Sequence, residues 1–301
     1  MSATQWLWLI VLSILWGGSF FFVGVAVNEV PTLTLVLARV GLAALVLLPI
    51  LAIVGLRLPH GWTAWQPFVG MAILNNILPF SLIALGQSQI ASGLASVLNA
   101  TTPLWSVVLA RLLIGDEKLT SARVGGLVLG VVGVAILMWP ALRDTALGSL
   151  FGMACVLGGA LSYGFAGVWG RRLRSTPPLV SAASQLIAST IMLAPAVAIV
   201  DAPWTLSQPS AGTLAALVGL AILSTAVAYI VFFHILSVSG PTNAMLVTLL
   251  IPISSIALGA LFLGERLLPE HIAGAALVAV ALVVFDGRAI GWLTATRSRQ
   301  P

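Results

Sequence analysis

The chain has 301 residues, of which 60% are hydrophobic and only 7% are charged. Soluble domains carry about 25% charged residues, so this chain has too few charged side chains to cover the surface of a water-soluble globule. Its net charge of +5 is distributed along the chain rather than gathered in one patch, which argues against nucleic acid as a partner. The composition therefore predicts an integral membrane protein.

Apolar stretches of about 20 residues, each long enough to cross the hydrocarbon core of a bilayer, recur along the whole chain. They predict an all-α fold of ten transmembrane helices, near residues 5–27, 33–56, 67–86, 93–114, 121–139, 148–170, 179–200, 210–236, 242–263 and 268–286. The first stretch lacks a basic n-region and an A-x-A cleavage site, so we expect a retained helix rather than a signal peptide. The connections are too short to hold a soluble domain.

The basic residues alternate between the two sides of these ten helices. With the N-terminus in the cytoplasm, ten basic residues fall on the inner side and two, Arg143 and Arg266, on the outer side. Cytoplasmic loops are enriched in Lys and Arg, so the bias predicts that both termini are cytoplasmic. The ten inner residues are Arg57, Arg111, Lys118, Arg123, Arg171, Arg172, Arg174, Arg288, Arg297 and Arg299.

The two halves of the chain match each other at an offset of 147 to 149 residues. The matches are Leu15-Trp16-Gly17 with Ser162-Tyr163-Gly164, Phe80 with Tyr229, Pro103 with Pro252, and Gly115-Asp116-Glu117-Lys118-Leu119 with Gly264-Glu265-Arg266-Leu267. We expect a first repeat at residues 1–140, a second at 148–286 and a cytoplasmic tail at 287–301. Each half has an odd number of helices, so the halves enter the membrane from opposite sides, as in many secondary transporters. A duplicated scaffold without transport is the alternative.

Each half ends in a proline, an apolar run, Gly-(Asp)-Glu-x-Leu and a glycine-rich last helix. In this pattern the chain resembles the drug/metabolite transporter superfamily, and within it the ten-helix EamA-like family, from residue 5 to about residue 286. The resemblance implies a central cavity lined mainly by spans 1, 3, 4, 6, 8 and 9. It also implies export of amino acids, aromatic ones among them, or of other small metabolites across a bacterial inner membrane.

Polar side chains inside predicted spans are costly in lipid and tend to face a cavity or the bundle interior. Asn76 and Phe80 share one face of the third span at α-helical spacing, and Thr225 and Tyr229 take the equivalent places in the eighth. Aromatic side chains would supply the apolar walls of a pocket. The candidate substrate-binding residues are Trp16, Phe20, Asn76, Phe80, Asn99, Trp105, Tyr163 and Tyr229. Packing between helices remains the alternative for each of them.

Three further residues have a possible role in transport. Arg39 lies about 9 Å inside the outer end of the second span. It either binds a substrate carboxylate, or extends toward the outer surface, or pairs there with a carbonyl or an acidic group. Pro103 and Pro252 interrupt their helices at equivalent positions and are expected to act as hinges or to free backbone carbonyls for the site.

No enzyme, cofactor or metal site is predicted. The three histidines form no H-E-x-x-H motif, and no G-x-S-x-G motif is present. The expected partners are a small-molecule solute and the lipid bilayer, with a monomer favoured and a dimer left open. A lipid or lipid-linked sugar flippase, a multidrug exporter and a channel remain alternatives to a metabolite exporter.

The carboxylates indicate how transport is driven. All eight Asp and Glu residues lie at or beyond the predicted ends of spans. No carboxylate is therefore placed at the midplane to exchange a proton for solute. We expect alternating access driven by the solute gradient, without obligatory coupling to protons.

Overall fold

The computed structural model describes residues 2–115, 120–143, 146–244 and 246–286, so the predicted tail at 287–301 lies outside the described residues. The helices are α1 (Ala3–Ala26), α2 (Thr32–Ile53), α3 (Trp62–Met71), η1 (Ala72–Ile77), α4 (Leu78–Gln87), α5 (Ser92–Asn99), α6 (Thr102–Leu113), α7 (Ser121–Arg143), α8 (Leu147–Trp169), η2 (Gly170–Leu173), α9 (Pro178–Val200), η3 (Pro203–Thr205), α10 (Ala211–Ala221), η4 (Ile222–Val227), α11 (Ala228–Ala244), α12 (Val247–Phe262) and α13 (Pro269–Asp286).

These elements confirm the expected all-α fold of ten membrane-crossing helices. Eight helical segments of the described residues are long and apolar enough to span a bilayer, and α12 and α13 are shorter apolar helices. Four spans are composite: α3, η1 and α4 form the third, α5 and α6 the fourth, α8 and η2 the sixth, and α10, η4 and α11 the eighth. The sequence predicted the third and eighth spans as continuous helices and expected an interruption at Pro103 in the fourth.

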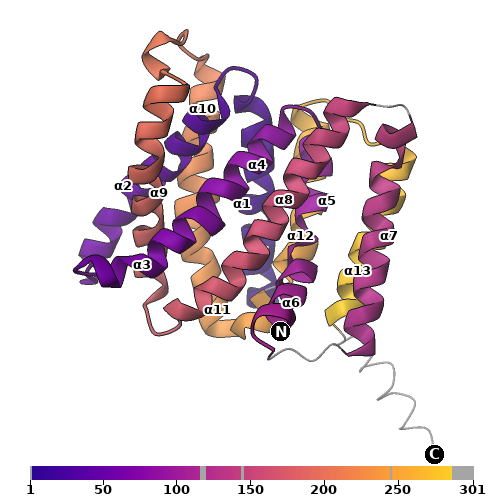
Figure 1. The fold of residues 1–301 in the computed structure, drawn as a ribbon, viewed down its shortest axis with the longest axis horizontal. Helices are drawn as coiled ribbons and strands as arrows, with labels where there is room; N and C mark the ends of the chain where they lie inside the picture. Colours follow the sequence, from indigo (N-terminus) through magenta and orange to yellow (C-terminus); the bar gives the residue numbers. More distant parts are fainter. Residues whose placement is uncertain (1, 116–119, 144–145, 245, 287–301) are drawn as a thin grey trace, which may run out of the picture.

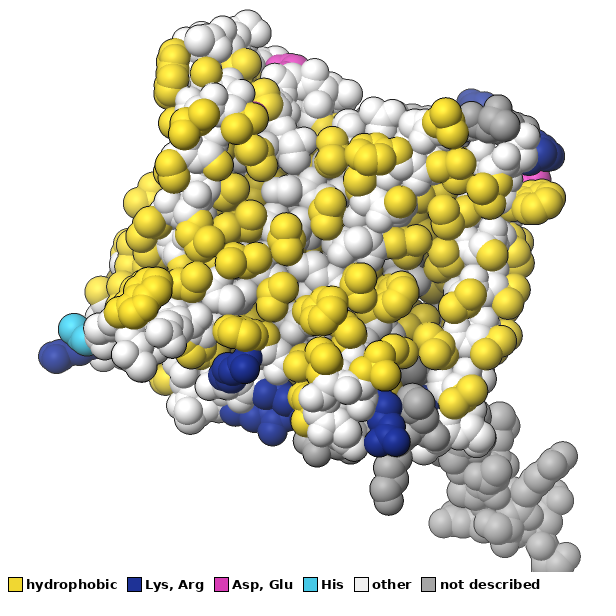
Figure 2. Space-filling view, in the orientation of Figure 1, with side chains coloured by type: hydrophobic (Ala, Val, Ile, Leu, Met, Phe, Trp, Pro, Cys, Tyr) yellow, Lys and Arg dark blue, Asp and Glu magenta, His cyan; other side chains and the backbone are white. Residues whose placement is uncertain are grey.

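An apolar surface surrounds the bundle where lipid would lie. On the face drawn in Figure 2, hydrophobic side chains cover the middle, and Lys and Arg gather mainly along the lower edge. Ile53, Leu147, Ile199 and Leu261 are each more than 75% exposed. Large apolar patches are rare on soluble monomers, so the surface agrees with a protein embedded in a membrane.

The two halves are intertwined, because each main helix pair joins one helix from each half. α1 packs on α12, and its repeat mate α8 packs on α6. α2 packs on α9, and α7 packs on α13, a pair that stands to one side of the bundle in Figure 1. The pair of α1 with α12 thus has its counterpart in the pair of α8 with α6, as an inverted repeat requires.

Two repeat-related glycines bring these helices close together. A Cβ atom on Gly17 in α1 would lie 2.7 Å from the Cβ of Ser254 and 3.1 Å from the carbonyl oxygen of Ile251, both in α12. A Cβ atom on Gly164 in α8 would lie 3.0 Å from the Cβ of Trp105 in α6. Small residues permit such close backbone approach between membrane helices.

We expect Gly17→Ala to push α1 away from α12 and to lower the free energy of unfolding by about 1–3 kcal/mol. Gly212→Ala is the matched control, since a Cβ atom there meets only the hydroxyl of Ser210, at 3.8 Å. Denaturation of both purified variants in detergent measures the difference. Equal stability of the two variants would contradict the close contact.

A carboxylate from the loop before α13 caps the helix α5. Both carboxylate oxygens of Glu265 accept bonds, from the backbone N–H of Ser92 (2.7 Å), from the Ser92 hydroxyl (2.9 Å) and from the N–H of Gly93 (3.1 Å). The first N–H groups of a helix have no partner within it, and the helix dipole favours negative charge there. Glu265 therefore ties a loop to a helix of the other half.

Two more carboxylates act in the same way. Asp201 accepts from the N–H and the hydroxyl of Thr34 at the start of α2, at 2.8 and 2.7 Å. Glu29 accepts from the N–H and the hydroxyl of Ser210 before α10, at 2.7 and 2.8 Å. These bonds, the backbone one first, lower the pKa of Glu29. Glu29, Asp201 and Glu265, the cap carboxylates, all follow odd-numbered spans and so share the predicted outer side.

Replacing Glu265 by Gln removes the charge but keeps one acceptor oxygen. We expect a loss of about 1–2 kcal/mol in the free energy of unfolding, because charge-assisted bonds at a helix start are replaced by neutral ones. Glu270→Gln is the control, since Glu270 lies in the first turn of α13 and caps no other helix. If Glu270→Gln lowers the free energy of unfolding as much as Glu265→Gln does, the effect comes from removing a negative charge and not from losing the cap of α5.

Candidate solute site

The third and eighth spans each contain a π-helical segment at nearly the same place in their repeat. η1 covers Ala72–Ile77 and η4 covers Ile222–Val227. A π turn widens the helix and changes which carbonyls are bonded, and such turns are frequent at functional sites. Side-chain hydroxyls meet the carbonyls around them: Ser162 donates to Leu74 O (2.8 Å), and Thr225 donates to Leu220 O (2.9 Å).

Arg39 contacts the second of these segments. It is the eighth residue of α2 and its side chain is buried, with 8% exposed. Its Nε–H donates to the hydroxyl of Thr225 at 3.0 Å, and its guanidinium carbon lies 3.6 Å from the centre of the Phe80 ring. A guanidinium over an aromatic face is stabilised by the quadrupole of the ring. The arginine is thus turned into the bundle, and the expectation that it extends toward the outer surface is wrong.

Two tyrosines from the second half complete this centre. Tyr163 in α8 and Tyr229 in α11 both lie near the Arg39 guanidinium and near each other. Tyr229 stacks on Phe233 with ring centres 6.0 Å apart. Tyr163 contacts both hydrophobic clusters of the bundle, whereas Phe80 and Tyr229 belong to one of them. Four predicted site residues, Arg39, Phe80, Tyr163 and Tyr229, therefore meet in one place.

The amide that joins this centre is Asn75, not Asn76. The Nδ2 atom of Asn75 donates to Gln185 Oε1 at 2.9 Å and to the hydroxyl of Tyr229 at 3.3 Å. Asn76 is fully buried and donates from Nδ2 to the hydroxyl of Ser189 in α9 at 3.0 Å. The prediction of Asn76 assumed that residues four apart share one face of an α-helix. A π turn contains one more residue, so the residue that shares a face with Phe80 is displaced by one position, to Asn75.

Gln185 was missed as well, although the repeat contains a signal for it. It is the eighth residue of α9, as Arg39 is of α2. At 1.5 Å per residue both lie about 10 Å from the starts of their helices, and those helices enter the membrane from opposite sides in the predicted topology. Arg39 thus contacts the π segment of the eighth span and Gln185 that of the third.

The remaining candidates make no contact with Arg39 among the described residues. Trp16 packs on Phe232 at 5.3 Å between ring centres, and Phe20 is buried, with its carbonyl accepting from Gln87 at 2.8 Å. Asn99 and Trp105 belong to the broken fourth span, and each has a buried polar atom, Oδ1 and Nε1, without a hydrogen-bond partner. Their role in solute binding stays a prediction.

The two prolines are not equivalent in the structure. Pro103 stands in the first turn of α6, directly after the break that separates α5 from α6. Pro252 lies inside the continuous helix α12, and the chain changes direction earlier, at Gly240 with φ 75°. The expected interruption is therefore found next to Pro103, whereas α12 runs through Pro252 without a break. A hinge role remains a prediction for both.

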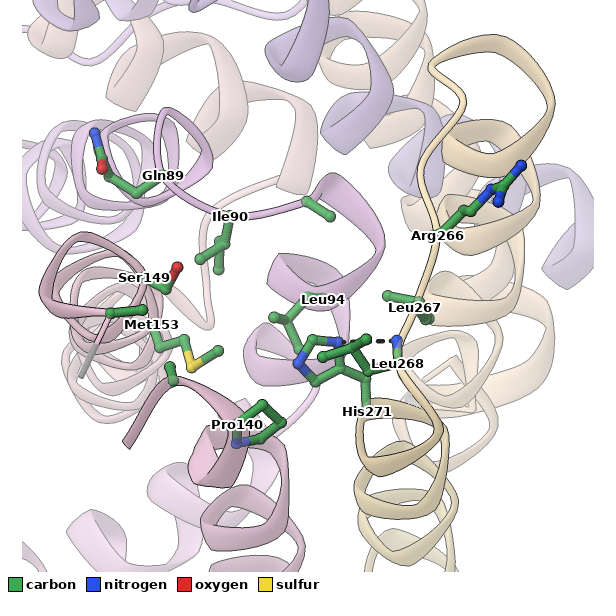
Figure 3. Close-up of a pocket in the computed structure, with 13 residues that line it drawn as sticks. Gln89, Ile90, Leu94, Pro140, Ser149, Met153, Arg266, Leu267, Leu268 and His271 are labelled. Carbon is green, nitrogen blue, oxygen red and sulfur yellow. Dashed lines mark hydrogen bonds between the residues drawn. The ribbon is translucent and has the colours of Figure 1, made fainter. Parts of the chain in front are cut away.

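A separate hollow of about 270 Å³ lies at the end of the bundle that holds Glu265. Figure 3 shows Leu94, Pro140, Met153 and His271 around it, while the Arg266 side chain points away. His271 accepts at Nδ1 from the N–H of Leu268 at 3.4 Å. Its lining includes none of the central residues, so this hollow is not the predicted site.

Intertwined inverted halves with a polar and aromatic centre define a multi-pass membrane transporter. The comparison with known proteins agrees: the chain belongs to the EamA-like transporter family, which matches residues 4–139 and 150–285. The resemblance inferred from sequence is confirmed, and the chain is a transporter rather than an enzyme.

Several relatives cover nearly the whole chain. The uncharacterized transporter YoaV of Bacillus subtilis is 25% identical over 90% of this chain and 92% of its own length. The uncharacterized inner membrane transporter YedA of Escherichia coli is 26% identical over 86% and 83%. A probable amino-acid metabolite efflux pump of Escherichia coli is 24% identical over 94% and 95%. The chain of one crystal structure aligns over its full length with the whole of this chain, at a TM-score of 0.67 and 18% sequence identity, so the two share a fold.

Substitution of Asn75 and Asn76 tests which of the two asparagines faces the centre. We expect Asn76→Ala to lower the free energy of unfolding by about 1 kcal/mol, since it removes a buried bond between helices. Asn75→Ala should affect stability less and raise the KM for solute, since Asn75 contacts Tyr229. Denaturation and transport assays on both variants measure the two effects. The reverse pattern would restore Asn76 as the site residue.

Proposed function

We propose that this protein exports small neutral, zwitterionic or amphipathic metabolites, with amino acids as the best candidates and aromatic ones among them. The cargo crosses a bacterial inner membrane by alternating access, with both termini of the protein in the cytoplasm. The observation that carries the proposal is the meeting of Arg39, Phe80, Tyr163 and Tyr229, which come from both repeats and lie beside both π segments. The relative named as a probable amino-acid metabolite efflux pump supports the same class of cargo.

The two repeats support alternating access in particular. Inverted halves can exchange roles, so that the arrangement closing one face is equivalent to the one closing the other. The helices that contribute to the centre belong to pairs that cross between halves, such as α2 with α9 and α4 with α8. A movement of these pairs would therefore change access to the centre from either side.

The described carboxylates support transport without obligatory proton coupling. Glu29, Asp201 and Glu265 are the cap carboxylates, and Glu270 lies in the first turn of α13. Asp286 ends α13, and Asp116, Glu117 and Asp144 lie outside the described residues. None of the carboxylates in the described ranges lies near the middle of a span, where a proton-exchanging group would have to be.

Transport into proteoliposomes that contain the purified protein in their membrane tests both the class of cargo and the absence of proton coupling. We expect labelled phenylalanine, leucine and other amino acids to equilibrate down their own gradients or by exchange, unchanged by an imposed pH gradient. Empty liposomes are the control. Accumulation against a gradient that needs the pH difference and is abolished by a protonophore would contradict the energetic proposal. Movement of a labelled lipid without amino-acid flux would support the flippase alternative instead.

A further inference from the structure

We propose that the Arg39 guanidinium binds the carboxylate of the transported solute. This inference rests on the proposed transport function and narrows its cargo to solutes that carry a carboxylate. The structure places a permanent positive charge at the meeting point of both repeats, inside the membrane, and the site holds little else that is charged.

The charge of Arg39 has no counterion among the described residues. None of the carboxylates in the described ranges comes within salt-bridge distance, and the described acidic residues lie at helix ends instead. A buried cation is unfavourable unless it is paired and hydrogen-bonded. The π contact with Phe80 offsets part of that penalty. An anionic group of a solute would supply the missing partner.

The hydrogen bonds that Arg39 makes with described residues leave the Nη edge of its guanidinium open to a carboxylate. A guanidinium carries five N–H donors in a planar fork. Only the Nε–H has a hydrogen-bond partner in the described part of the chain, the hydroxyl of Thr225. The Nη atoms remain for a carboxylate, which the fork can bind through two parallel bonds.

The orientation of the guanidinium is fixed before any solute arrives. The Phe80 ring supports one face of the plane at 3.6 Å, and Thr225 fixes the Nε edge. Thr225 is itself held, because its hydroxyl donates to the carbonyl of Leu220 at 2.9 Å. A preorganised donor loses less entropy when it binds, which favours a binding role over simple packing.

The surroundings of Arg39 suit the rest of an amphipathic acid. The rings of Tyr163, Tyr229 and Phe233 offer an apolar wall for an alkyl or aromatic group. Next to Tyr229, Asn75 and Gln185 present amide oxygens that can accept bonds from an amino group. Organic cations are disfavoured, because nothing described in the site offsets repulsion by Arg39.

Ligand binding to the purified protein tests this inference independently of transport. Three probes differ in one group each: L-phenylalanine, 3-phenylpropionate, which has the carboxylate alone, and phenethylamine, which has the amine alone. Thermal-shift titrations of wild type, Arg39→Gln and Arg39→Lys give relative affinities. Arg57→Gln is the matched control, since Arg57 is exposed in the loop after the same helix.

We expect wild type and Arg57→Gln to bind both carboxylates at least about 10-fold more tightly than phenethylamine. Arg39→Gln should weaken carboxylate binding by about 10–100-fold and abolish the preference. Arg39→Lys keeps the charge without the fork, so its preference should be intermediate, and it preserves the test if Arg39→Gln does not fold. The preference, rather than the affinity alone, separates binding from a structural role.

Three results would overturn the inference: equal binding of phenethylamine and 3-phenylpropionate to wild type, an unchanged carboxylate preference in the Arg39 variants, or no binding of any probe. Proteoliposome flux of phenylalanine, measured in parallel, tests the function separately. Carboxylate-selective binding without flux would contradict transport and keep the site. Flux of phenylalanine together with an unchanged preference for carboxylates in Arg39→Gln would support transport and contradict the binding role of Arg39.

Discussion

The structure depends on the need to satisfy every backbone polar group inside lipid. A membrane provides no water for an unpaired carbonyl or N–H, so irregular backbone is tolerated only where protein surrounds it. The π segments η1 and η4 and the break between α5 and α6 are such places. Hydroxyl groups are placed around them, from Ser162 and Thr225 among others. The same irregular turns that demand polar neighbours thereby create a polar centre in an apolar bundle.

The sequence was sufficient for features that depend on composition and on long apolar runs. Span positions, the repeat and the aromatic members of the centre, Phe80, Tyr163 and Tyr229, all followed from it. It failed where a local irregularity changes the register. An α-helical spacing selects Asn76, whereas the π turn presents Asn75 to Tyr229. A π turn arises from packing between distant helices, so the local spacing of polar residues contains no direct sign of it.

The repeat is symmetric in its backbone but not in its chemistry. Equivalent eighth positions of α2 and α9 hold Arg39 and Gln185, a cation and a neutral amide. The fourth span breaks ahead of Pro103, whereas α12 runs through Pro252 without a break. Duplication thus supplied two interchangeable frameworks, and divergence placed a single charge in the centre. A symmetric fold can in this way hold an asymmetric solute in one orientation.

The cap carboxylates have a consequence for the order in which the protein is made. The starts of α2 and α5 belong to the first half, yet their N–H groups are satisfied by Asp201 and Glu265, which a ribosome adds much later. During synthesis these helix ends face the aqueous side of the membrane without their partners. The first five helices alone are therefore an incomplete product, and the final arrangement of the first repeat forms only after the second has been inserted.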